Sequence, residues 1–167
     1  MLLADAYVKV VKGPAVDNDG AGYYACARGN QRGVYLFSQD FTPFASQLSG
    51  RFVADETVTC DTRMPDNPYC VGYVIVYDSR TRRIRRTTLR KSPVGYVRRA
   101  EGFAVNARGW ASWLRSTPDG YNMWVWAPGA QPQVVASSQT IEPFSLALTS
   151  HTAYWTDGGQ PRSYALR

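Results

Sequence analysis

The chain has 167 residues, of which 44% are hydrophobic and 13% aromatic, and it carries a net charge of +6 with three cysteines and one histidine. This length suits one domain with a core of its own, and the composition excludes a disordered chain. No apolar run approaches the ~20 residues of a membrane-spanning helix, so the sequence predicts no membrane span.

The first six residues resemble the end of a signal peptide. A Leu-Leu pair is followed by Ala4-Asp5-Ala6, which has the small-x-small pattern of a cleavage site. We therefore expect residues 1–6 to be a signal-peptide remnant and residues 7–167 to form a single domain. The protein is then expected in the periplasm, at the cell surface or outside the cell.

Several segments before residue 92 have the composition of short β-strands, because they are rich in β-branched and aromatic residues and are bounded by turn-forming residues. In chain order they are residues 7–12, 22–27, 33–38, 41–48, 51–59, 71–78 and 82–91. Residues 22–27 and 33–38 are expected to form a hairpin. The segment VGYVIVYD at 71–78 is the most continuous apolar strand, which favours a place inside a sheet.

Two of the three cysteines, Cys60 and Cys70, bracket the polar segment DTRMPDNPY. A disulfide there would stabilise the fold by roughly 2–3 kcal/mol and would fit an oxidising compartment. A zinc site is disfavoured, because the chain has no CxxC motif and His151 is its single histidine. We expect a Cys60–Cys70 disulfide, a buried free thiol at Cys26, and no metal or other cofactor.

The basic residues concentrate between positions 80 and 99, where nine Arg or Lys stand with no acid. Arginines at odd and even positions put charge on both faces of a strand, so this strand should lie at the edge of a sheet. Its charge either blocks edge-to-edge aggregation or binds a polyanion such as nucleic acid, acidic polysaccharide or lipid headgroups. The candidate contacts are Arg82, Arg83, Arg85, Arg86, Arg90 and Lys91.

The segment 102–138 contains four short apolar runs separated by turn sequences. The runs are residues 103–105, 110–114, 123–126 and 133–136. This spacing predicts a compact antiparallel unit of four strands. The last unit, 144–167, supplies three strands, and Tyr7–Lys12 is expected to add the fourth.

Parts of the chain repeat one another as an apolar strand, a turn and a second strand. FAVNARGWASW (103–113) aligns with LALTSHTAYW (146–155), and SQLSGRFVAD (46–55) and NDGAGYYACA (18–27) fit the same frame. Four strands in about 40–45 residues are typical of a β-propeller blade. Over residues 44–167 the units resemble the repeats of secreted propellers of the TolB/YVTN kind, which implies a small ring of blades.

The sequence therefore predicts an all-β fold of antiparallel four-stranded repeats, as a small β-propeller or a propeller-like array. A β-sandwich of the same hairpins is one alternative. An open array completed by oligomerisation is another, because the chain length reaches only the lower limit for a ring. Trp113 and Trp155 occupy matching repeat positions, and we expect them to pack between neighbouring repeats.

Groups suited to catalysis are scarce. His151 stands in a Ser-His-Thr turn, and the chain has no GxSxG nucleophile motif for it to serve. Asp55 and Glu56 are adjacent in a strand, so they point to opposite faces, and we interpret them as solvated groups. We expect no enzyme, and a hydrolase with carboxylates around a central pocket is the least favoured alternative.

Trp124 and Trp126 alternate with Met123 and Val125, which places both indoles on one face of a strand. An exposed face would offer a platform for sugar rings or a partner protein, whereas a buried face would be core, and the core interpretation is preferred. The expected function is that of a non-catalytic binding or scaffold module that contacts a protein or a glycan. The alternative is binding of an anionic polymer through the stripe 80–99.

Overall fold

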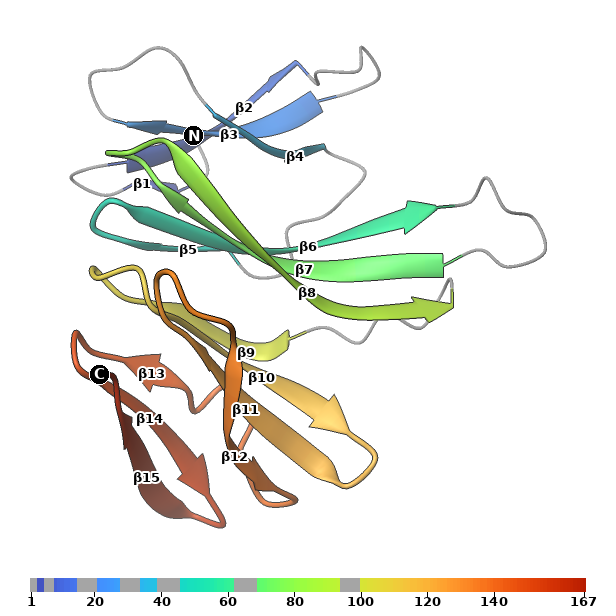
Figure 1. The fold of residues 1–167 in the computed structure, drawn as a ribbon, viewed down its shortest axis with the longest axis vertical. Helices are drawn as coiled ribbons and strands as arrows, with labels where there is room; N and C mark the ends of the chain where they lie inside the picture. The colour runs from blue at the N-terminus through green and yellow to red at the C-terminus, as the bar shows by residue number, and fades with distance from the viewer. Residues whose placement is uncertain are drawn as a thin grey trace. The chain divides into compact units, whose positions relative to one another are not determined.

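The computed structural model of the chain is all-β (Figure 1). It describes residues 3–4, 8–14, 21–27, 34–38, 46–61, 69–93 and 100–167, with side chains at 22, 24–26, 47–56, 70–88 and 100–167. These residues form fifteen strands, all paired antiparallel in four sheets, and no helix. The predicted all-β antiparallel fold is confirmed. The chain divides into two compact units, Met1–Val97 and Arg98–Arg167, which are described in turn.

The first sheet of the N-terminal unit has the order β1-β2-β3-β4. Its strands are β1 (Leu3–Ala4), β2 (Val8–Pro14), β3 (Ala21–Ala27) and β4 (Val34–Ser38). The predicted hairpin of residues 22–27 and 33–38 is confirmed as β3–β4. Residues 3 and 4, within the predicted signal-peptide remnant, pair with β2.

Two expectations about this sheet were wrong. β3 is the third strand of its sheet, so the repeat frame placed on NDGAGYYACA is displaced by one strand. β2 is paired on both sides, by β1 and by β3, so residues 7–12 do not supply the fourth strand of the last sheet. The physical reason is the same in both cases: the short strand β1 was not recognised, and it pairs with the edge of β2 opposite β3.

The second sheet has the order β5-β6-β7-β8. Its strands are β5 (Ser46–Ser49), β6 (Phe52–Asp61), β7 (Tyr69–Asp78) and β8 (Arg83–Pro93). Buried side chains of β6 and β7 alternate between the two faces, with Val53 and Tyr77 on one and Ala54 and Val76 on the other. Central strands covered on both faces have continuous apolar sequences, which agrees with the inner position predicted for 71–78.

The C-terminal unit begins with a sheet of order β12-β11-β10-β9. Its strands are β9 (Ala100–Val105), β10 (Ala111–Thr117), β11 (Gly120–Trp126) and β12 (Gln133–Ser138). They contain the four apolar runs predicted in the segment 102–138, except that Trp110 of the second run lies just before β10. Residues 144–167 supply three strands, as expected, and these form the whole of the last sheet: β13 (Ala147–Leu148), β14 (Thr152–Asp157) and β15 (Gln160–Ala165).

One core cluster joins the two sheets of the C-terminal unit. It contains Trp110, Leu114, Met123, Val125, Ile141, Ala153, Trp155 and Leu166. Trp155 of the last sheet packs in this cluster with residues of β10 and β11, so the expected packing between repeats is confirmed for Trp155. Trp113 is also buried, at 1% exposure.

The buried amide of Asn106 connects the turns that precede β10 and β14. Its Oδ1 accepts hydrogen bonds from the backbone N–H groups of Arg108 (3.0 Å) and Trp110 (3.1 Å). Its Nδ2 donates to the carbonyl oxygen of Thr149 at 2.7 Å. The equivalent residue of the next repeat is Thr149, whose hydroxyl accepts from the backbone N–H of Thr152 at 3.1 Å. The two turns therefore use the same local device, a side-chain oxygen that substitutes for a backbone acceptor.

Candidate functional site

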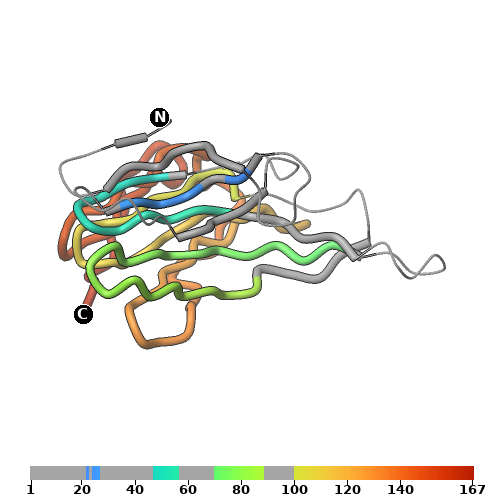
Figure 2. The backbone as a smooth tube through the Cα atoms, turned by 90° about the horizontal axis from the view of Figure 1, so that it is seen from above, coloured from blue at the N-terminus to red at the C-terminus, as the bar shows by residue number. Residues whose placement is uncertain are grey.

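The basic segment forms the turn and the outer strand of the β7–β8 hairpin, whose coloured parts run side by side in Figure 2. β8 is the last strand in the order of its sheet, which confirms the predicted edge position. Arg82 and Arg83 are exposed. Arg90 and Lys91 belong to β8, but their side chains lie outside the described residues.

The turn that precedes β8 is organised by the carboxylate of Asp78. Its Oδ1 accepts from the backbone N–H of Arg80 at 3.0 Å and lies 3.2 Å from Nε of Arg51. Arg82 takes a φ of 56°, in the left-handed region that ends such turns. Asp78 is thus occupied by Arg51 and by the turn. Among the residues with described side chains, no acid forms an ion pair with Arg80, Arg82 or Arg83.

Arg85 and Arg86 point to opposite faces of β8 and differ in surroundings. Arg85 is half-buried, and burial lowers the pKa of its guanidinium while the charge of Asp78 partly opposes that shift. Arg86 is exposed, and its guanidinium carbon lies 4.8 Å from the centre of the Tyr73 ring. This cation–π contact holds Arg86 along the sheet. The residues most available to a ligand are therefore the arginines of the turn and the start of β8.

The tryptophans of β11 fit the core interpretation better than the platform interpretation. Trp126 is only 4% exposed, and its indole N–H donates to the carbonyl oxygen of Ala130 at 2.9 Å. Trp124 is half-buried and stacks on Trp113, with ring centres 6.0 Å apart and planes 3° from parallel. A platform of both indoles would need both rings exposed, and Trp126 is not.

The interpretation of Asp55 and Glu56 as solvated groups was wrong. Asp55 is 1% exposed and Glu56 is fully buried. They point to opposite faces of β6, as adjacent strand residues must, but β6 is an inner strand and both of its faces are covered. Both residues interact with neighbouring groups. This arrangement gives no pair of carboxylates that face one substrate.

The cysteines occupy two distinct settings. Cys26 is a free thiol in β3 and is 5% exposed. Cys60 of β6 lies directly opposite Cys70 of β7 in the strand register, and Cys70 is not a free thiol. Directly opposed residues of an antiparallel pair have Cα atoms ~4.5–5.5 Å apart, which lies within the range for a disulfide.

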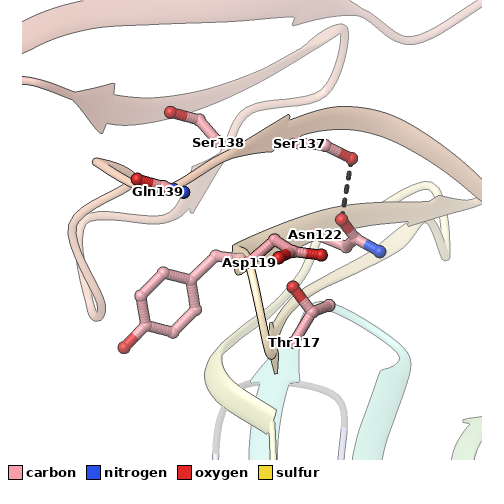
Figure 3. Close-up of a pocket in the computed structure, with 7 residues that line it drawn as sticks. Thr117, Asp119, Asn122, Ser137, Ser138 and Gln139 are labelled. Atoms are coloured by element: carbon pink, nitrogen blue, oxygen red, sulfur yellow. Dashed lines mark hydrogen bonds between the residues drawn. The ribbon is translucent and has the colours of Figure 1, made fainter.

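A polar cavity of about 390 Å³ lies in the C-terminal unit and was not anticipated from the sequence. Its lining residues are Thr117, Asp119, Tyr121, Asn122, Ser137, Ser138 and Gln139 (Figure 3). They come from the β10–β11 hairpin and the end of β12. The signal available in the sequence was the turn Thr117-Pro118-Asp119-Gly120, which indicates the hairpin but not the segment that meets it.

No protein-family model matches the chain, and neither a curated protein nor a solved structure is significantly similar to it. The resemblance to TolB/YVTN propellers therefore stays an expectation based on the repeat pattern. Over the described part of the chain, no helix is long and apolar enough to cross a membrane.

Proposed function

We propose that the protein is a non-catalytic binding module that holds an anionic polymer along the β7–β8 hairpin. The observation that carries this proposal is the group of exposed arginines, Arg80, Arg82 and Arg83, at one end of an edge strand. The acid nearest to them in the chain, Asp78, is already paired with Arg51. Arginine suits sulfate, phosphate and carboxylate groups because its planar guanidinium donates two parallel hydrogen bonds.

Edge protection is the competing explanation for the same arginines, since charged edge strands resist pairing with other sheets. Protection requires charge anywhere along β8. It does not require three arginines at the turn, because Arg80 and Arg82 precede β8 and Arg83 is its first residue. The clustering at the turn therefore supports a ligand role. A protein or glycan contact through Trp124 and Trp126 has less support, because Trp126 is buried.

The test is retention on a heparin column over a salt gradient. The first variant combines Arg80→Ser, Arg82→Ser and Arg83→Ser, and the matched control combines Arg108→Ser, Arg162→Ser and Arg167→Ser, which are exposed and lie in the other unit. We expect the hairpin variant to elute at clearly lower salt, with a salt dependence reduced by about two to three ions. Equal shifts in both variants would mean that net charge alone sets retention, and would reject the proposal.

We also propose a propeller-like arrangement and export to an oxidising compartment. Sequential antiparallel sheets of three or four strands support the first proposal. The register of Cys60 opposite Cys70 supports a disulfide between them, and with it the second. The disulfide is tested by alkylation followed by mass measurement. The protein is unfolded without reductant and alkylated, and only Cys26 should then react with the reagent.

A further inference from the structure

Phe144 combines two properties that are rarely found together. It lies in the turn Glu142-Pro143-Phe144-Ser145, and its side chain is 83% exposed. Its backbone has a φ of 67°, in the left-handed region that favours glycine and asparagine. A large apolar side chain gains no stability from contact with water, and at positive φ it also strains the backbone. The stability of the single chain therefore does not account for a phenylalanine at this position.

The turn that carries Phe144 is fastened to two strands. The backbone N–H of Ser145 donates to the carbonyl oxygen of Glu142 at 3.3 Å, which closes the turn with Phe144 at its third position. The N–H of Phe144 donates to the carbonyl oxygen of Glu101 in β9 at 3.2 Å. The hydroxyl of Ser145 accepts from the backbone N–H of Thr156 in β14 at 2.9 Å. These bonds hold the backbone of Phe144 in place before any partner arrives.

The chain on either side of this turn carries acidic groups and no cation. Residues 116–161 contain Asp119, Glu142 and Asp157 but neither Lys nor Arg. Glu142 is exposed and stands two positions before Phe144. Anionic lipid and nucleic acid are disfavoured as partners by this charge. An apolar ring beside a carboxylate suits a surface on which an apolar side chain lies among arginines.

A surface of this kind is present on the β7–β8 hairpin. Ile84 is 46% exposed, and among the exposed large hydrophobics with described side chains it is the one that stands between two arginines in the sequence. Because side chains alternate along a strand, Ile84 shares its face of β8 with the exposed Arg86, whose guanidinium is already held by the Tyr73 ring. Arg82, one residue before β8, adds a second exposed cation. These three residues, Arg82, Ile84 and Arg86, form the Ile84 surface.

We propose that the turn 142–145 of one copy of the chain binds the Ile84 surface of a second copy. The Phe144 ring covers Ile84. The Glu142 carboxylate pairs with Arg82 or Arg86, since guanidinium groups stack on aromatic rings and donate to carboxylates. Each copy carries one surface of each kind, so the contact is head-to-tail and extends from copy to copy. It goes beyond the proposed polymer binding and does not depend on it.

Sedimentation velocity of the full chain at low salt tests this proposal. A contact of this size is weak, so we expect monomer at about 10 μM and a rising weight-average sedimentation coefficient toward about 1 mM. Phe144→Asn, a replacement that suits a positive φ, should stay monomeric over this range. The combination of Ile84→Ser with Arg86→Ser should do the same.

A mixture of these two variants gives the decisive measurement. Phe144→Asn keeps an intact Ile84 surface, and the double variant keeps an intact turn. Together they should form a dimer and nothing larger, because each supplies the surface that the other lacks. A contact in which one surface pairs with itself does not predict this rescue.

The matched control is Tyr154→Asn, which removes another exposed aromatic ring, 44% exposed on β14, and should associate like the wild type. The proposal is overturned if the wild type stays monomeric to about 1 mM, if Phe144→Asn associates like the control, or if the mixture remains monomeric. Phe144→Asn should elute from heparin like the wild type, so failure of this contact and failure of the polymer site give different results. Far-UV circular dichroism before mixing verifies that each variant is folded.

Discussion

At the scale of single residues, the amide of Asn106 is the clearest case of one side chain that supports several parts of the fold. It is 3% exposed and makes three hydrogen bonds to backbone groups of two turns. Replacing it by Ala would leave these donors and the acceptor without their partner. The cost of leaving a buried polar group unsatisfied is about 1–3 kcal/mol.

We therefore expect Asn106→Ala to lower the free energy of unfolding by about 2–4 kcal/mol, measured by urea denaturation followed by tryptophan fluorescence. Ser163→Ala serves as the control and should change stability by less than about 0.5 kcal/mol. A loss in Asn106→Ala no larger than in the control would show that water replaces the amide, and that the two turns do not depend on it.

The sequence identified the apolar core at this scale but not the buried polar residues. Alternation and repeat position were enough to predict that Trp113 and Trp155 are buried, because large aromatics at matching positions have little alternative. Asp55 and Glu56 could not be predicted as buried, since their type indicates solvent and only the inner position of β6 overrides it. Asn106 was not singled out, because its contact to Thr149 joins positions 43 apart in the chain.

At the scale of elements, the β6–β7 hairpin is a long ladder of paired residues. The cysteine pair lies at the end of this ladder that is next to the connecting loop. Cys60 and Cys70 enclose the loop between the strands, so a disulfide would restrict the unfolded chain by a loop of about eleven residues, worth about 2.8 kcal/mol in the chain-entropy treatment. Reduction should lower the urea midpoint accordingly. The double variant Cys60→Ser, Cys70→Ser should match the reduced wild type, while Cys26→Ala should retain its sensitivity to reductant.

If the reductant leaves the wild-type midpoint unchanged, the proposed disulfide is absent or contributes nothing to folding. The far-UV circular dichroism of each variant, recorded without urea, verifies that the comparison is made between folded proteins.

Elements could be predicted wherever the sequence carried a strong local pattern. The edge position of β8 followed from charge on both faces, and the four strands of residues 100–138 followed from apolar runs and turns. The first sheet was placed wrongly because β1 has only two residues and carries no pattern of its own. The polar cavity was missed because it needs the end of β12 to meet Gly120, a contact between segments that only the folded sheet brings together.

At the scale of the whole molecule, the outer edge of the last sheet must be protected against pairing with strands of other molecules. Among the described residues, no strand pairs with the outer side of β15. The N–H and C=O of Thr156 bond to Ser145 Oγ and to Glu142 N, away from β15. Its register partner Pro161 must then direct its backbone outward, where proline presents no N–H to an incoming strand.

We expect Pro161→Thr to increase self-association, because it restores a donor on the open edge beside the outward N–H groups of Ser163 and Ala165. Sedimentation velocity over a range of protein concentrations measures the effect. Gln160→Thr is the matched control, since Gln160 lies opposite Asp157 in the hairpin and its backbone faces inward. If the two variants remain equally monomeric, Pro161 does not protect the edge.

The order of the strands has a consequence for how fast the chain reaches its fold. Within all four sheets, each described strand pairs only with its neighbours in sequence. None of these strand pairings therefore joins segments that are distant in the chain. Folding rates fall as the mean sequence separation of contacts rises, and proteins made of β-sheets are usually slow for that reason. The strand topology of this chain is an exception, because its pairings are local in sequence. Its hairpins can therefore form locally, and we expect the docking of the sheets to be the slower step.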